Sequence, residues 1–166
     1  TNIAGIIDDA LDEVDETVII TLSSPTNSTL GTTQLTYTIR DDDAQPSIAF
    51  TSDNFAASEA TTNGQFSLAL SGASGKEITY GYTINAVTTT ASDDGVDYTL
   101  TAGTNRISAG AAVSTIDFTV NDDALDEIDE VLVVTLDTDA FVNVATTGSP
   151  LEATYTIQDD DNPPNI

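Results

Sequence analysis

Two acidic motifs of the sequence have the composition of cation-binding sites. The motif DDALDE(V/I)DE occurs at residues 8–16 and 122–130, and a DDD triplet occurs at 41–43 and 159–161. These four segments hold 18 of the 28 acidic residues, in a chain with only three cationic residues and a net charge of −25. An acidic surface adapted to a salty habitat does not require clustering, whereas clustered like charges repel unless cations neutralise them. The clustering therefore favours metal sites.

The composition also indicates which metal. The chain has no histidine and no cysteine, so the usual ligands of zinc and copper are missing. Many carboxylate oxygens suit Ca²⁺, which takes about six to eight oxygen ligands, better than Mg²⁺, which requires a tight octahedron. The spacing is not that of an EF-hand, because no D-x-[DN]-x-[DN]-G loop is present. We expect Ca²⁺ as the cofactor.

The same composition argues against several other functions. A surface of this charge repels nucleic acid and anionic lipid, and no apolar run of 18 residues is present to insert into a membrane. The sequence lacks the histidine of a catalytic triad, a cysteine nucleophile and a glycine-rich phosphate loop. Paired carboxylates also serve glycosidases, but the sequence has no tryptophan for sugar binding. We expect that the protein is not an enzyme.

The chain contains an internal repeat. DDALDEVDETVIITL at 8–22 matches DDALDEIDEVLVVTL 114 positions later, and LTYTIRDDDAQPSI at 35–48 matches ATYTIQDDDNPPNI 118 positions later. This period is that of whole domains in tandem. We expect residues 1–43 to be the C-terminal part of one repeat, residues 44–163 a complete repeat and residues 164–166 the start of a third. A cut from a longer array explains this phase, and strand donation by another molecule is the alternative.

Apolar residues alternate with small or polar ones in several short segments of the complete repeat. Period-two segments separated by Gly, Asn, Asp and Pro predict an all-β fold, an antiparallel two-sheet sandwich of about seven strands. The predicted inward-facing residues are Phe66, Leu68, Leu70, Ile78, Tyr80, Tyr82, Ile84, Ile116, Phe118, Val120, Leu132, Val134, Leu136, Tyr155 and Ile157. Each DDALDE motif, which has the composition of a short helix or a loop, precedes a predicted strand, and each DDD follows one. We therefore expect both motifs at one end of the sandwich.

These residues resemble the Calx-β repeat family, first described in sodium–calcium exchangers and common in bacterial surface proteins. The resemblance rests on the DDxxxExxE loop, the DDD triplet, the G-x-D-Y element at Gly95–Tyr98 and Glu59. It covers residues 46–163 and, as a partial copy, 1–43. It implies a seven-stranded immunoglobulin-like sandwich with a cluster of calcium ions at one end.

The resemblance also implies which residues hold the ions. In the complete repeat these are Glu59, Asp97, Asp122, Asp123, Glu127, Glu130, Asp159, Asp160 and Asp161, with the carbonyl of Leu125. In the partial repeat they are Asp8, Asp9, Glu13, Glu16, Asp41, Asp42 and Asp43, with the carbonyl of Leu11; counterparts of Glu59 and Asp97 are missing. Four further acids fall between ligand positions, where we expect them to be solvated or to support the ligands: Asp12, Asp15, Asp126 and Asp129.

Three functions fit this organisation. The first is a structural spacer of an extracellular, bacterial cell-surface adhesin or filament, in which ions between domains stiffen the array. Its partners are neighbouring repeats and other copies in a filament. The second is a calcium-sensing regulatory module. The third is a recognition module that binds a ligand through the segments Thr88–Asp94 and Phe141–Pro150, although variable surface loops have the same composition.

Overall fold

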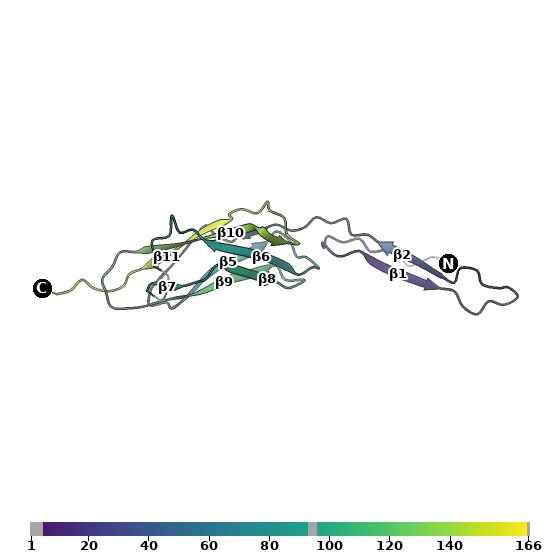
Figure 1. Ribbon diagram of the computed structural model, residues 1–166, viewed down its shortest axis with the longest axis horizontal. Helices are drawn as coiled ribbons and strands as arrows, with labels where there is room; N and C mark the ends of the chain where they lie inside the picture. The colour runs from purple at the N-terminus through teal and green to yellow at the C-terminus, as the bar shows by residue number, and fades with distance from the viewer. Residues whose placement is uncertain (1–4, 93–95, 166) are drawn as a thin grey trace.

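The computed structural model describes residues 5–92 and 96–165, and within them the protein is all-β, as predicted. The strands are β1 (Glu16–Thr21), β2 (Gln34–Ile39), β3 (Ile48–Phe50), β4 (Asn54–Ser58), β5 (Asn63–Leu70), β6 (Ile78–Ile84), β7 (Tyr98–Thr99), β8 (Gly103–Ile107), β9 (Val113–Val120), β10 (Glu130–Val142) and β11 (Glu152–Gln158). Among these residues no helix is long and apolar enough to cross a membrane. Figure 1 shows an elongated molecule, with the β1–β2 hairpin at one end and the other strands in a sandwich beside it.

The sandwich consists of two sheets. One has the order β4-β11-β10-β6-β8, and the other has the order β3-β5-β9-β7. Its neighbouring strands are antiparallel except for the parallel pair β4 and β11. The segments β3 and β4 are close in sequence but lie in different sheets, and so do β7 and β8. If β3 with β4, and β7 with β8, are each counted as one strand that passes from one sheet to the other, the sandwich has the seven strands that the sequence predicted.

The core lies between the sheets and confirms the period-two prediction. Side chains from alternate positions of β5, β6, β9, β10 and β11 are buried, with Phe66, Tyr80 and Leu132 fully inaccessible. Of the predicted inward-facing residues, only Tyr82 and Ile84 are half-buried. Phe66 lies at the centre of an aromatic cluster, with its ring centroid 5.5 Å from that of Phe118 and 5.8 Å from that of Tyr155. Tilted and edge-on ring contacts of this kind fix the packing of the two sheets.

The β1–β2 hairpin forms a sheet of its own. Large apolar side chains on it remain exposed, among them Ile19 at 58% and Leu35 at 61%. The connection to the sandwich is short, because Pro46 and Ser47 already belong to the sandwich: the carbonyl of Pro46 accepts the N–H of Ala145 at 2.8 Å, and the N–H of Ser47 donates to Ser71 Oγ at 3.0 Å. Only Ala44 and Gln45 remain between the DDD triplet and these bonds. The division into repeats at residues 43 and 163 remains a prediction.

Candidate metal centre

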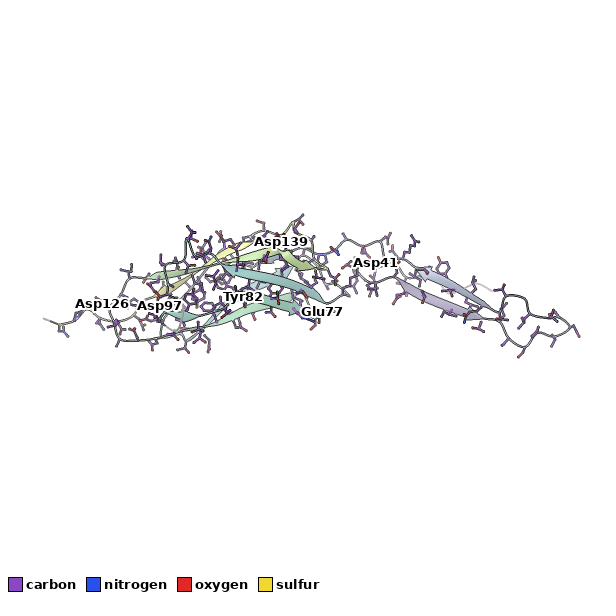
Figure 2. All side chains as sticks on the ribbon, viewed as in Figure 1. Asp41, Glu77, Tyr82, Asp97, Asp126 and Asp139 are labelled. Atoms are coloured by element: carbon purple, nitrogen blue, oxygen red, sulfur yellow. The ribbon has the colours of Figure 1, made fainter. Side chains whose placement is uncertain are left out.

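The carboxylates predicted in the complete repeat meet at one end of the sandwich. Glu59 follows β4, Asp97 precedes β7, Asp122 and Asp123 lie beyond β9, Glu130 begins β10, and Asp159–Asp161 follow β11. Figure 2 shows Asp97 and Asp126 at this end, and Asp41 at the joint with the hairpin. Antiparallel strands bring the exit of one strand next to the entry of its neighbour, so the topology assembles residues that are up to 102 positions apart. We call this end of the sandwich the acidic end.

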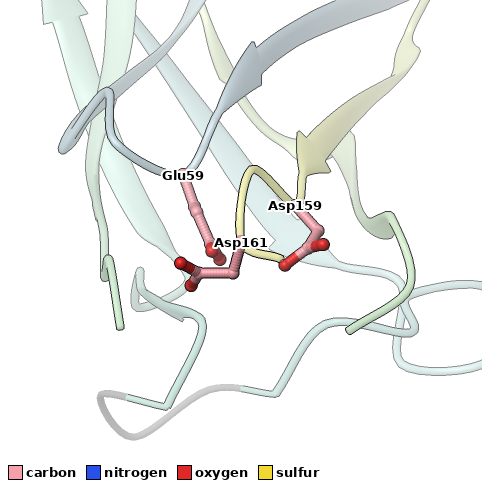
Figure 3. A group of neighbouring side chains, drawn as sticks. All are labelled: Glu59, Asp159 and Asp161. Carbon is pink, nitrogen blue, oxygen red and sulfur yellow. The ribbon is translucent and has the colours of Figure 1, made fainter. Parts of the chain in front are cut away.

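Three groups of carboxylates at the acidic end have oxygens within 4.8 Å of one another. Figure 3 shows the first group, in which Glu59 and Asp161 point toward each other beside Asp159. The groups are Glu59, Asp159 and Asp161; Glu59, Asp122 and Asp160; and Asp97, Glu127 and Glu130. They include eight of the nine predicted carboxylate ligands and leave out Asp123.

The buried oxygens of the first group are not paired within the protein. Glu59 is 7% exposed, and its Oε1 has no hydrogen-bond partner, nor do Asp159 Oδ1 and Asp161 Oδ2. Such atoms are costly unless something donates to them or coordinates them. Burial, followed by the charges of Asp159 and Asp161, raises the pKa of Glu59 to about 7. A group of unpaired anionic oxygens fits a hard cation, because a cation satisfies the oxygens and removes their repulsion.

The third group is held by a backbone framework around Asp97. Its carboxylate accepts a hydrogen bond from the N–H of Ser92, and its carbonyl accepts one from Asn121 N at 2.9 Å. Burial, then a hydrogen bond to Asp97, raises the pKa of Glu130 to about 7. Gly95 of the predicted G-x-D-Y element lies outside the described residues, as do Asp93 and Asp94 of the predicted recognition segment.

Both copies of the acidic motif are loops rather than helices, and hydrogen bonds of one pattern shape them. Asp9 Oδ1 accepts the N–H of Leu11 at 2.9 Å, and Asp123 Oδ1 accepts that of Leu125 at 2.7 Å. These hydrogen bonds fix the backbone at the two leucines through their N–H groups and do not involve their carbonyl oxygens. The proposed role of the carbonyls as ligands stays a prediction.

The sequence left open which of the acids between ligand positions are solvated and which support the ligands. Asp129 Oδ1 accepts the N–H of Asp159 at 3.3 Å, and Asp15 Oδ1 accepts that of Asp41 at 3.2 Å. Each ties the acidic loop to the DDD triplet of its own repeat. Asn121 was also missed: its buried Nδ2 has no partner, and the matching position in the first copy is Ile7, so comparing the copies gave no signal.

The predicted ligands of the partial repeat meet in a different setting. All eight line one hollow at the joint end of the hairpin: Asp8, Asp9, Leu11, Glu13, Glu16, Asp41, Asp42 and Asp43. Burial, then Asp41 and Asp42, raises the pKa of Asp43. Within residues 5–92 and 96–165, however, the three close carboxylate groups all belong to the complete repeat. Residues 1–43 contain no equivalent of Glu59, which takes part in two of the groups, or of Asp97, which takes part in the third.

A two-sheet antiparallel β-sandwich of this kind is an immunoglobulin-like fold, and here one of its ends is lined by carboxylates. The family model of the Calx-beta domain matches residues 41–161. The chain belongs to the Calx-beta domain family, as the sequence motifs predicted. No curated protein sequence matches it.

Solved structures of Calx domains share this fold. The chain is similar to "calcium binding domain CBD12 of CALX1.1", with 22% identity and a TM-score of 0.60 over 69% of this chain and 44% of that one. It is similar to "Apo-form Calx CBD1 domain", with 20% identity and a TM-score of 0.60 over 71% of this chain and 100% of that one. For "Calx CBD2 domain" the identity is 15% and the TM-score 0.55, over 70% and 91%. The chain thus spans less than half of the CBD12 structure.

Proposed function

We propose that this chain is a non-catalytic, calcium-binding structural repeat of a long extracellular protein of the bacterial cell surface, an adhesin or a filament. The observation that carries the proposal is the set of unpaired buried oxygens of Glu59, Asp159 and Asp161 at the acidic end. The CBD12 structure is titled a calcium binding domain, which agrees with this assignment.

The ligand chemistry favours Ca²⁺ over other cations. The acidic end offers carboxylate oxygens from four separate segments and no nitrogen or sulfur ligand from histidine or cysteine, since the chain has neither. Nine carboxylates require about four divalent ions for neutrality, a charge count that follows from the repulsion of the groups. The residues that would hold the ions are those of the three groups, together with Asp123.

The position of the acidic segments supports a mechanical role. The hollow lined by Asp41–Asp43 lies where one unit ends, and only Ala44 and Gln45 separate it from the bonds of the next. So short a connection leaves bending as its main freedom. Ions that neutralise this hollow fix the exit of β2 and hence the direction of the next domain. In an array, this gives an extended rod with calcium and a more flexible string without it.

The second candidate is a calcium-sensing module. It is favoured by the fold shared with the CALX calcium-binding domain structures. A sensor transmits binding to an effector domain, whereas a spacer needs only its neighbours. The sequences that flank this chain distinguish the two: further repeats support the spacer, and a transport or catalytic domain supports the sensor.

The proposal is tested by calorimetric calcium titration of the full chain, followed by small-angle scattering in calcium and in chelator. We expect binding of more than one ion, and a narrower range of molecular dimensions in calcium. Absence of calcium binding would overturn the assignment of the site. Binding without any change in dimensions would overturn the mechanical role alone.

A further inference from the structure

The joint between the hairpin and the sandwich is a specific contact between two loops. The acidic loop of residues 8–16 meets the turn of residues Ser74–Lys76, which connects β5 to β6. Gly75 N donates to the carbonyl of Asp12 at 2.9 Å, and Ser74 Oγ lies 3.0 Å from Asp12 Oδ2. Lys76 Nζ lies 2.6 Å from Asp12 Oδ1. The turn therefore pairs both carboxylate oxygens and the carbonyl of a single residue of the other unit.

Because the contact is buried, Asp12 needs the hydrogen bonds and the positive charge that the Ser74–Lys76 turn provides. Asp12 is 2% exposed and Ser74 is 1% exposed. A buried carboxylate without a hydrogen-bonded counter-charge is strongly unfavourable, so removing either partner exposes the other to that cost. Lys76 is one of only three cationic residues in the chain, and it also lies 3.8 Å from Asp41 of the DDD triplet.

The shape of the turn matches the acidic loop as well. A Cβ added at Gly75 would lie 2.9 Å from Glu13 Cγ and 3.0 Å from Glu13 Oε1, closer than ordinary contacts allow. Gly72, in the same β5–β6 connection, has nothing within 4 Å of such a Cβ. Neither glycine has a positive φ. A side chain at position 75 would therefore have to displace the Glu13 side chain, so the small residue there accommodates the approach of the other unit rather than the turn itself.

We propose that the Ser74–Lys76 turn is a docking site for the acidic loop of the preceding repeat and that it recognises this loop through Asp12. By the same proposal, Asp126 docks on the matching turn of a following repeat. Asp126 occupies the position of Asp12 in the second DDALDE motif and is exposed at the far end of the molecule. The partner is thus a copy of this domain with a hydroxyl residue, a glycine and a lysine in its β5–β6 turn. This inference rests on the tandem arrangement in the proposed function and adds a specific contact that sets the angle between repeats.

The test measures the joint directly in the full chain. Because the chain has no cysteine, spin labels at Thr36→Cys in β2 and Thr104→Cys in β8 report one distance across the joint. In saturating calcium we expect a single narrow distance peak, which Lys76→Gln and Gly75→Ala replace with a broad distribution. Gly72→Ala and Asp126→Asn are the matched controls and should leave the peak unchanged. The substituted residues 75 and 76 lie outside the acidic loop, so neither substitution removes a carboxylate from it.

A chain extended after residue 166 by a second copy of residues 49–163 tests the second half of the proposal. Asp12→Asn should broaden the distance distribution across the first joint, and Asp126→Asn should do the same across the new one. A distance peak that stays narrow in Lys76→Gln and Gly75→Ala would overturn the docking site, and insensitivity of the new joint to Asp126→Asn would overturn the role of Asp126. Calcium titration of the unsubstituted chain and of the same variants distinguishes these outcomes from failure of the proposed function. If the unsubstituted chain binds no calcium, the proposed function fails, whatever the distances across the joints show.

Discussion

The molecule contains one hairpin twice, in two different environments. In β1–β2, Glu16 pairs with Ile39 and Thr21 with Gln34; in β10–β11, Glu130 pairs with Ile157 and Thr135 with Glu152. These pairs are equivalent by the repeat, so the six-pair register is the same. The burial differs: the residues of β1 and β2 are mostly exposed, whereas Leu132, Val134, Tyr155 and Ile157 are buried. Register is therefore a local property of the two strands, and burial depends on the sheets around them.

The two acidic loops of the candidate metal sites are likewise similar in local structure and different in their surroundings. In both copies an aspartate accepts the N–H of the leucine two positions later, and another aspartate accepts the N–H of the first residue of the DDD triplet. Only the second copy forms the three close carboxylate groups, because Glu59 and Asp97 come from β4 and the start of β7. The loop motif supplies part of the site, and the surrounding sandwich supplies the rest.

The largest expected effect compares the two equivalent tyrosines. Tyr155 is 5% exposed and packs edge-on against Phe118, whereas Tyr37 is 47% exposed. Tyr155→Ala should lower the free energy of unfolding by about 3–5 kcal/mol, as large-to-small core substitutions of aromatic residues do. Tyr37→Ala should change it by about 0.5 kcal/mol or less. Urea unfolding measures both, and equal losses would show that the exposed hairpin has a core of its own.

Calcium should also stabilise the sandwich, by a smaller amount for each ion bound. A ligand that binds only the folded state stabilises it by about 2.7 kcal/mol per independent site at a hundredfold excess over its dissociation constant. We expect a clearly higher unfolding temperature in calcium than in chelator. Thermal unfolding monitored by circular dichroism measures the difference. An unchanged midpoint would mean that the carboxylate groups are not calcium sites.

The two glutamates that begin the equivalent hairpins should contribute unequally to binding. Glu130 belongs to a close group with Asp97 and Glu127, whereas Glu16 belongs to none among the described residues. Glu130→Gln should weaken calcium binding about tenfold, or ~1.4 kcal/mol, and Glu16→Gln should weaken it less. Asp139→Asn is the control, since Asp139 is exposed and outside the acidic segments. Calorimetric titration giving the same loss for all three would indicate diffuse surface charge.

The pH dependence of the metal-free protein should show the smallest effect. The pKa of Glu59 is raised from 4.5 to about 7, chiefly by burial, so the folded state binds a proton that the unfolded state releases. Its contribution to stability is complete below about pH 4.5 and is lost as the pH rises through about 7. Glu59→Gln should flatten this decline in chelator. Unfolding midpoints across this range measure it, and a slope that survives the substitution would assign the effect to other groups.

Several features follow from the sequence alone. Alternation at Phe66, Leu68 and Leu70 predicted a buried strand face, because successive side chains point to opposite faces of a sheet. The matching DDALDE motifs predicted equivalent loops, and the identical aspartate turns at Leu11 and Leu125 show why: their bonds join residues two positions apart. Such features depend on neighbours along the chain, which the sequence displays directly.

The tertiary structure alone decided how segments far apart in the chain meet. Glu59 and Asp161 share a group although 102 positions separate them, and their unpaired oxygens appear only once β4 lies beside β11. Asp12 and Asp126 occupy the same place in the same motif, yet one is buried against Lys76 and the other is exposed. The environment of a charged side chain is set by the surfaces that pack around it, and those surfaces come from segments far away in the chain.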